Sequence, residues 1–366
     1  MKNTFGNSLS ITLWGESHGE SIGAVLDGLA PGIKVDLDYI AEKLTLRRPT
    51  GSISTARQES DPINIESGVF NGYTTGTPLT IRIPNGDTRS KDYSATRFLA
   101  RPSHADYTAH EKYHGFEDFR GGGHFSGRIT AGIVAVGAIV ISALEQNGIY
   151  IGTHVKKCAG ISDSDFTNNI KDEIQLLSKK TFSVLSDSLA EKMERAIIEA
   201  KENGDSVGGI LETAIVGMPR GIGEPWFDSL ESSLSHAMFS IPAIKGIEFG
   251  AGFALADMKG SEANDPFRMD DGKIITSTNN SGGINGGVSN GMPIIFRTVI
   301  RPTPTISKEQ ETVDMSKMEN AVLESRGRHD PCIVHRARIV QDCMTAITLY
   351  DAIATRYGTD WAVKGL

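Results

Sequence analysis

The sequence has few of the features that mark secreted or disulfide-stabilised proteins. Its 366 residues include only three cysteines, Cys158, Cys332 and Cys343, and none of them forms a Cys-x-x-Cys pair. A sparse, odd cysteine count argues against a disulfide framework and indicates a reducing compartment. The N-terminus lacks the long apolar stretch of a signal peptide. We therefore expect a cytoplasmic protein.

Basic charge and long apolar runs are also lacking. The formal net charge is −8, which argues against nucleic acid as a partner. The apolar run from Ile129 to Leu144 is shorter than the roughly 20 residues that span a membrane. It predicts a buried helix and no membrane segment. No GxGxxG follows a strand-like segment and no GxxxxGK[ST] is present, which argues against a Rossmann domain and a P-loop.

Glycine, by contrast, is abundant, with 40 residues in 366. Average proteins contain about 7% glycine. An excess of glycine in a globular chain indicates many tight turns, or backbone that must approach a ligand closely.

Three pairs of segments echo each other in the same order along the chain. Gly19-Glu-Ser-Ile-Gly-Ala-Val-Leu-Asp27 is similar to Gly204-Asp-Ser-Val-Gly-Gly-Ile-Leu-Glu212, and each continues into a turn and a helix-like segment, at about 38–48 and 227–239. The strand-like segments 76–82 and 291–297 form the second pair.

The third pair consists of two apolar helices, each beginning at an arginine and ending at a glycine. One is expected from Arg128 to Gly148 and the other from Arg338 to Gly358, because glycine just past a helix end is a common C-terminal stop. A further amphipathic helix is expected over 187–203. The echoes predict one α+β domain over 1–366, with two similar halves at about 10–150 and 200–358.

Polar residues of types that can catalyse reactions or bind ligands gather in the loops between these elements. His18 lies in Gly15-Glu-Ser-His-Gly19, and a histidine can protonate a leaving group near neutral pH. Arg47 and Arg48 precede a turn and could bind phosphate or carboxylate. Taken alone, a surface turn and a solvated helix end explain these two clusters as well.

Three further loops combine arginine, histidine, aspartate and glycine. They are 101–106 (RPSHAD), 119–128 (FRGGGHFSGR) and 324–331 (ESRGRHDP). The glycine run leads directly into the apolar helix, and free N–H groups at a helix N-terminus favour anions. The charge density of the last loop is costly to bury without a ligand or ion pairs.

One motif points to a different chemistry. His110-Glu-Lys-Tyr-His114 matches HExxH, the zinc protease signature. A zinc site needs both histidines on one helical face and a third ligand downstream. Gly115 follows at once, and Glu117 and Arg120 occupy the later positions of the extended motif.

Taken together, the loops resemble the chorismate synthase family, from residue 15 to about 350. The most specific matches are RPSHADYT (101–108), EKYHGFEDFRGGGHFSGR (111–128) and GRHDPC (327–332). The other matching segments are GESHG (15–19), RRP (47–49), TTGTPL (74–79), DYSA (92–95), GDSVGG (204–209), GMPRGIGEP (217–225), SIPAIKGIEFG (240–250), GGINGG (282–287) and RPTPTI (301–306).

The resemblance implies a trans-1,4 elimination of phosphate from 5-enolpyruvylshikimate-3-phosphate (EPSP) to give chorismate, with reduced FMN and no net redox change. It implies a helical core between two four-stranded antiparallel sheets and a homotetramer. No added reductase module is evident in the sequence, so we expect a separate flavin reductase or NADPH-dependent supply of reductant.

The resemblance also implies roles for particular residues. His18 would protonate the leaving phosphate, His104 would protonate or stabilise the anionic reduced flavin, and Asp330 would act at flavin N5. Ser17 and Ser126 would relay protons. Phosphate and carboxylate groups would be bound by Arg47, Arg48, Arg101 and Arg128. Flavin contacts would come from His124, Phe125, Ser126, Pro242, Ala243, Gly286, Arg301, Pro302, Thr303, Pro304, Thr305 and Arg328.

The sequence departs from the family pattern at two places. Many members have arginine and serine where this chain has His124 and Phe125, and further arginines where it has Leu46 and Ile53. Three alternatives stay open: an FMN-dependent oxidoreductase with net electron transfer, a zinc hydrolase, and a phosphate-binding module without catalysis.

Overall fold

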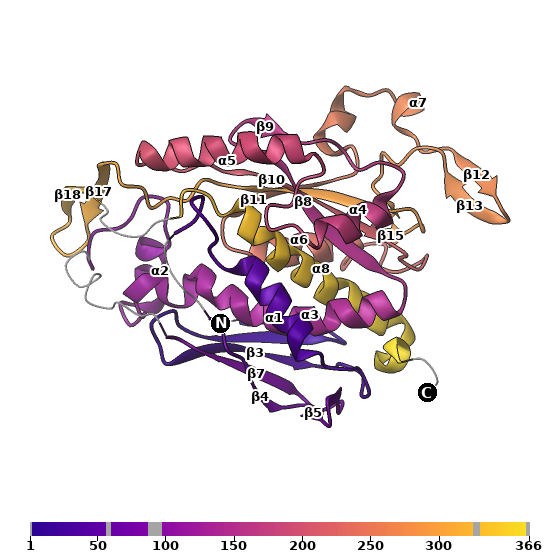
Figure 1. Cartoon of the computed structure of the whole chain (residues 1–366), viewed down its shortest axis with the longest axis horizontal. Coiled ribbons are helices and arrows are strands. Elements are labelled where there is room, and N and C mark those ends of the chain that lie inside the picture. Colours follow the sequence, from indigo (N-terminus) through magenta and orange to yellow (C-terminus); the bar gives the residue numbers. More distant parts are fainter. Residues whose placement is uncertain (1, 56–59, 87–96, 325–329, 364–366) are drawn as a thin grey trace.

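The computed structural model describes residues 2–55, 60–86, 97–324 and 330–363. Figure 1 shows three layers, with a bundle of helices between two antiparallel sheets. The predicted helical core between antiparallel sheets is confirmed.

The first sheet is formed by the N-terminal part of the chain. Its strands are ordered β1 (Thr4–Phe5), β2 (Ser10–Gly15), β3 (Ser21–Asp27), β7 (Leu79–Pro84) and β4 (Asn64–Ser67). Strand β7 alternates buried and partly exposed residues, and its Leu79, Ile81 and Ile83 are buried. This period of two gives the sheet one apolar face, which packs against the helices.

The second sheet has the same architecture. Its order is β9 (Ile161–Ser162), β8 (Tyr150–Cys158), β10 (Gly209–Val216), β16 (Ile294–Ile300) and β11 (Ile244–Phe249). Each sheet therefore has five strands, and the expected number of four was wrong. The extra strand in each is a two-residue edge strand, β1 or β9, too short to produce a sequence pattern.

Four helices fill the space between the sheets: α1 (Leu37–Arg47), α3 (Thr130–Gln146), α6 (Leu230–Ser240) and α8 (Val334–Tyr357). Helix α3 is buried almost throughout, as the apolar run predicts. The helical stretch Gly127–Gln146, which includes α3, is long and apolar enough to span a membrane, yet it is largely enclosed by the protein. A Cβ at Gly137 would lie 2.4 Å from Cys343 Cβ, so glycine allows α3 and α8 to pack closely.

Helix α8 begins earlier than expected. Its first residue is Val334, four positions before Arg338, where the third sequence echo placed the start. Both glycine stops are present, with φ of +80° at Gly148 and +87° at Gly358. The amphipathic helix expected over 187–203 is α5 (Asp187–Glu202), which lies outside the second sheet.

The two sheets correspond strand by strand, which supports the proposed duplication. The second echo is confirmed, because β7 and β16 begin three residues after Gly76 and Gly291 and pair with β3 and β10. The first echo was misaligned. Leu79 faces Leu26 and Ile294 faces Ile215, so Leu26 corresponds to Ile215, whereas the sequence alignment matched it to Leu211.

The remaining elements lie around this core. They are β5 (Val69–Phe70), β6 (Tyr73–Thr74), α2 (Asp106–Tyr113), η2 (Arg120–Phe125), η3 (Gly127–Ile129), α4 (Ile170–Leu177), η4 (Gly252–Asp257), α7 (Gly260–Ala263), β12 (Phe267–Asp270), β13 (Lys273–Thr276), β14 (Ile284–Asn285), β15 (Val288–Ser289), β17 (Gln310–Asp314), β18 (Glu319–Leu323) and η5 (Thr359–Ala362).

Candidate active site

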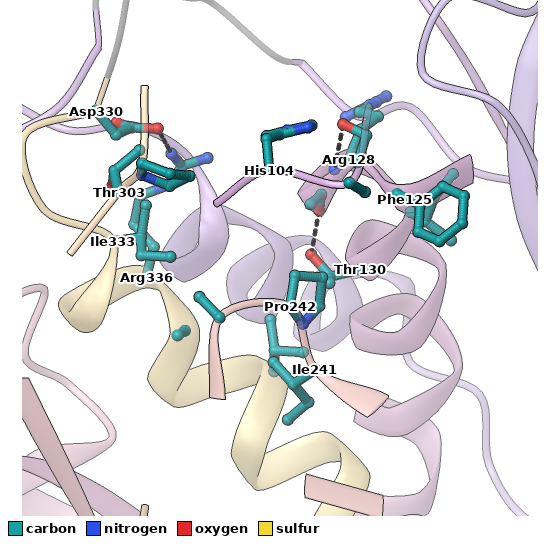
Figure 2. A pocket seen from close by; sticks show the side chains of 18 of the residues that line it. His104, Phe125, Arg128, Thr130, Ile241, Pro242, Thr303, Asp330, Ile333 and Arg336 are labelled. Carbon is teal, nitrogen blue, oxygen red and sulfur yellow. Dashed lines mark hydrogen bonds and ion pairs between the residues drawn. The ribbon is translucent and has the colours of Figure 1, made fainter. Parts of the chain in front are cut away.

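A cavity of about 700 Å³ lies where the ends of the central helices from both halves meet. This volume is within the range of small-molecule and cofactor sites, roughly 300–1,000 Å³. Figure 2 shows His104 and Arg128 from the first half near Asp330 and Arg336, with Ile241 and Pro242 of the second half below. The cavity therefore combines a charged rim with apolar walls.

A turn of three glycines shapes one wall. Gly121, Gly122 and Gly123 have φ values of +59°, +86° and +53°, a region that residues with side chains rarely adopt. A Cβ at Gly121 would lie 2.2 Å from Cε1 of His18, and one at Gly122 would lie 3.2 Å from Cε1 of His104. Glycine is needed here because two histidines press against the turn.

His104 lines the cavity and is held by a carboxylate from its own loop. Its Nδ1 lies 2.9 Å from Oδ1 of Asp106, and Arg101 donates to both Asp106 oxygens at 2.8 and 2.7 Å. Burial alone would raise the pKa of Asp106, but the hydrogen bonds from Arg101 and His104 hold it well below its usual range. Arg101 therefore binds Asp106 here and is not among the residues that line the cavity.

His18 lies on the other side of the glycine turn. Its Nδ1 is 3.2 Å from the hydroxyl of Ser17, which also lies 3.1 Å from the carbonyl oxygens of Arg120 and Gly121. The hydroxyl can donate to one of these carbonyls while it accepts from His18. Gly121 lines the cavity, whereas Ser17 and His18 do not. The structure thus places His18 beside the cavity, with the glycine backbone next to it.

Three of the predicted anion-binding arginines converge on one buried carboxylate. Asp61, whose side chain is 0% exposed, contacts Arg47 at 3.4 Å and Arg48 at 3.8 Å, and also Arg128. Burial alone would raise the pKa of Asp61, but Arg47, Arg128 and Arg48 keep it below its usual value. Arg47 and Arg128 line the cavity and Asp61 does not. One negative charge against three positive charges leaves the cluster cationic.

Asp330 is held at the rim by one residue near it in the sequence and one that is distant. Its Oδ2 accepts from Arg336 at 2.6 Å and its Oδ1 accepts from the backbone N–H of Thr55 at 2.9 Å. We expected Arg328 as the neighbouring cation, and Arg328 lies outside the described residues. Arg336 was missed by the sequence reasoning. The available signal was its position in the first turn of α8, directly after the charged loop.

The second half supplies mainly neutral groups to the cavity. Pro242, Ala243 and Thr303–Thr305 line it, together with Arg301, whose backbone N–H bonds to Ala243 O at 3.1 Å. From the first half, Ser126 caps the short helix η3 by accepting from the Arg128 N–H. His124 contacts the Gly15 carbonyl at 2.7 Å, and Phe125 packs edge-on against Tyr113.

Some predicted residues lie elsewhere. Gly286 is in the turn between β14 and β15, and neither it nor Arg48 or Pro302 lines the cavity. In the HExxH segment, α2 ends at Tyr113 and His110 Nδ1 lies 3.2 Å from Glu117. Within the described part of the chain, no group of three histidine, cysteine or acidic side chains is arranged to hold a metal.

Known proteins resemble this chain over nearly its full length. A family model described as chorismate synthase matches residues 9–354. Chorismate synthase of Thermococcus gammatolerans is 42% identical over 359 residues, covering 98% of this chain and 99% of the relative. That of Pyrococcus abyssi is 44% identical, covering 96% and 97%. A solved structure titled "Crystal Structure of Chorismate Synthase" superposes with a TM-score of 0.77 at 28% identity, covering 97% of this chain and 94% of that one.

Proposed function

The chain belongs to the chorismate synthase family, and from this premise we propose that the cavity between the two halves is its active site. The chain is a lyase that eliminates phosphate from EPSP to give chorismate, and the family uses reduced FMN. We assign the binding of substrate and flavin to this cavity.

The cationic cluster around Asp61 carries the proposal. EPSP bears one phosphate and two carboxylates, so its site must offset several negative charges. Arg47 and Arg128 present guanidinium groups to the cavity, with a net charge of about two when Arg48 and Asp61 are included. Guanidinium groups bind phosphate and carboxylate through paired, charge-assisted hydrogen bonds. We therefore place the phosphate of EPSP at this end.

The other residues of the cavity fit an FMN molecule. A flavin ring needs flat apolar contacts, and Phe125, Ile241, Pro242 and Ala243 provide them along the walls. Its phosphate and ribityl hydroxyls need hydrogen-bonding partners, which Arg301 and Thr303–Thr305 supply. When bound, reduced flavin would supply transient electron density for the elimination. Gly286, Pro302 and Arg328 stay predicted contacts.

Two histidines and Asp330 are proposed to hold and move protons. His104 faces the cavity and would stabilise negative charge there, while His18, positioned by Ser17, would protonate the departing phosphate. Asp330 uses one lone pair of each oxygen for Arg336 and Thr55, which leaves further lone pairs to accept a proton. Ser126 would relay protons from the wall of the cavity.

Replacing single histidines tests these roles. General acid and base groups contribute roughly 10²–10⁴-fold to rates. We expect His104→Ala and His18→Ala each to lower kcat at least about 10-fold with normal folding. His110→Ala, outside the cavity, should change kcat little, and a larger loss there than at His104 would refute the assignment.

We further propose a homotetramer in the cytoplasm that is supplied with reduced flavin by a separate reductase or an NADPH-dependent system. Large apolar side chains are exposed on the second half, including Trp226 at 85% and Phe227 at 90%, and also Phe253, Phe267 and Met269. Such groups commonly mark surfaces that associate. Sedimentation should show a tetramer at micromolar concentration, and a monomer would contradict this part.

An anaerobic assay tests the function itself. With EPSP and chemically reduced FMN, phosphate and chorismate should form in equal amounts, with many turnovers per flavin and no consumption of reductant. An oxidoreductase with net electron transfer would consume one equivalent of reductant per product. Full turnover with oxidised FMN in air and without a reductase would contradict the proposed use of flavin.

A further inference from the structure

The carboxylate of Asp106 collects hydrogen bonds from one short loop. It accepts from the Arg101 backbone N–H at 3.0 Å, from the Arg101 guanidinium at 2.8 and 2.7 Å, and contacts His104 Nδ1 at 2.9 Å. Asp106 itself does not line the cavity, whereas His104 does. The carboxylate can therefore influence chemistry in the cavity only through the histidine.

The geometry decides which nitrogen of His104 carries a proton in the neutral ring. An unprotonated Nδ1 would direct its lone pair at a carboxylate oxygen 2.9 Å away, and the two would repel. A proton on Nδ1 turns this contact into a charge-assisted hydrogen bond. Nδ1 is then the donor to Asp106, although Arg101 also lies 3.1 Å from it. Nε2 has no hydrogen-bond partner among the described residues.

Building on the role proposed above for His104, we propose that Asp106 is a positioning residue that fixes the proton of His104 on Nδ1. It thereby leaves Nε2 available to ligands in the cavity. An aspartate that orients a histidine in this way is a familiar device in hydrolases, where it selects the tautomer and stabilises the imidazolium. Arg101, expected to bind substrate, would instead anchor the carboxylate.

The charges around the cavity show why such a carboxylate matters. Arg47, Arg128, Arg301 and Arg336 line the same cavity, and Asp330 is the one carboxylate among the described lining residues. Asp106, whose carboxylate contacts His104 directly and does not itself line the cavity, places a negative charge behind this cationic lining.

Asp106→Asn should move the proton of the neutral His104 ring from Nδ1 to Nε2. Asparagine offers a single acceptor oxygen, and the Arg101 guanidinium is the stronger donor for it. The amide N–H₂ would then face Nδ1, which favours the tautomer with the proton on Nε2. We expect kcat to fall at least about 10-fold, while the dissociation constants for FMN and EPSP change less than about threefold. Asp106→Glu should partly restore kcat.

The chain provides a matched control in Asp118. Its carboxylate also accepts two hydrogen bonds from the guanidinium of an arginine in its own loop, Arg120, both at 2.8 Å. Asp118 interacts electrostatically with His18, and no hydrogen bond from His104 to Asp118 is found among the described residues. Asp118→Asn therefore removes a comparable ion pair and should leave the His104 tautomer unchanged.

Long-range ¹H–¹⁵N spectra of protein labelled with ¹⁵N-histidine measure the tautomer directly, with His104 assigned from its absence in His104→Gln. The wild-type spectrum should show Nδ1–H, and Asp106→Asn should show Nε2–H. A wild-type Nε2–H tautomer, or an Asp106→Asn variant with unchanged tautomer and kcat, would overturn the proposal. The wild-type spectrum decides even if the variant does not fold. Loss of the proposed function would appear separately, as absent turnover by wild-type enzyme.

Discussion

The C-terminal ends of α1 and α6 occupy matching places in the two halves but differ in charge. Both helices have 11 residues, and one ends in Arg47-Arg48-Pro49 while the other ends in Ser240-Ile241-Pro242. The residue before each proline is extended, as proline requires. Arg47 and Ser240 both line the cavity. The two matching helix ends thus deliver a cation from one half and a hydroxyl from the other.

This difference shows how a symmetrical frame can hold an asymmetrical ligand pair. The first half supplies both histidines and the arginine cluster around Asp61. From the second half come the proline and threonine contacts and the Asp330–Arg336 pair. A polyanionic substrate and a largely apolar ring can then bind side by side, because each meets a wall of suited chemistry.

Removing the cation at the end of α1 should have the largest effect on catalysis. We expect Arg47→Ala to lower kcat/KM for EPSP by about 10²-fold, since truncating a buried charged contact typically costs 2–5 kcal/mol. Ser240→Ala, at the matching position of α6, should change kcat/KM less than about twofold. Steady-state kinetics with reduced FMN measures both, and thermal unfolding checks that Arg47→Ala folds. Equal losses in the two variants would contradict the assigned asymmetry.

Asp61→Asn sharpens the comparison with a smaller effect. The Asp61 carboxylate contacts the three guanidinium groups from outside the cavity and fixes their positions. Its loss should therefore raise KM for EPSP about 10-fold, as for other lost supporting groups. Calorimetric titration with EPSP measures the same change as a weaker affinity. Tighter binding in Asp61→Asn would mean that Asp61 competes with the substrate and does not position the arginines.

His154→Gln tests whether buried charge in the second half is structural. His154 is fully buried between Asp163 at 2.9 Å and Glu212 at 3.0 Å. It points away from α8, because its neighbour Thr153 bonds to Asp342 of that helix. We expect unchanged kcat/KM and a loss of about 3 kcal/mol in the free energy of unfolding at pH 6.

The stability effect at His154 should depend on pH. Burial alone would lower the pKa of His154, but the hydrogen bonds to Asp163 and Glu212 raise it. Because the pKa is higher in the folded state, the charged imidazole stabilises the fold fully at pH values below the unfolded-state pKa of about 6.5. This stabilisation is lost as pH rises through the folded-state pKa. The difference in unfolding free energy between wild type and His154→Gln should therefore shrink at alkaline pH. A difference that grows with pH would contradict the charged state.

The sequence patterns predicted those features that depend on local runs and spacings of residues. The buried helix α3 was identified from an apolar run, α5 from the helical spacing of its apolar residues, and the corresponding strands β7 and β16 from β-forming residues after a proline. The register of β3 against β10 was misjudged. The Gly-x-Ser-x-Gly stretch at 19–23 overlaps the start of β3, whereas the similar stretch at 204–208 ends just before β10, and only the strand bounds and pairing show this.

The sequence indicated several residues that the fold gathers at the cavity, but few of the contacts between them. Arg47, His104 and Asp330 line the cavity as the loop clusters indicate. Asp61 was missed because folding brings it to arginines that no spacing rule connects to it. Arg336 was missed although it lies close to Asp330 in sequence, because it belongs to the first turn of α8 and not to the loop motif. Asp106 was visible in its motif, but its role depends on the direction of one imidazole nitrogen.

A crystal structure with oxidised FMN and EPSP bound would test the central claim most directly. The account predicts the EPSP phosphate against Arg47 and Arg128 and the flavin ring along Phe125, Pro242 and Ala243, both within the cavity between the halves. Either ligand bound outside this cavity, or the EPSP phosphate on the neutral side beside Ser240, would contradict it.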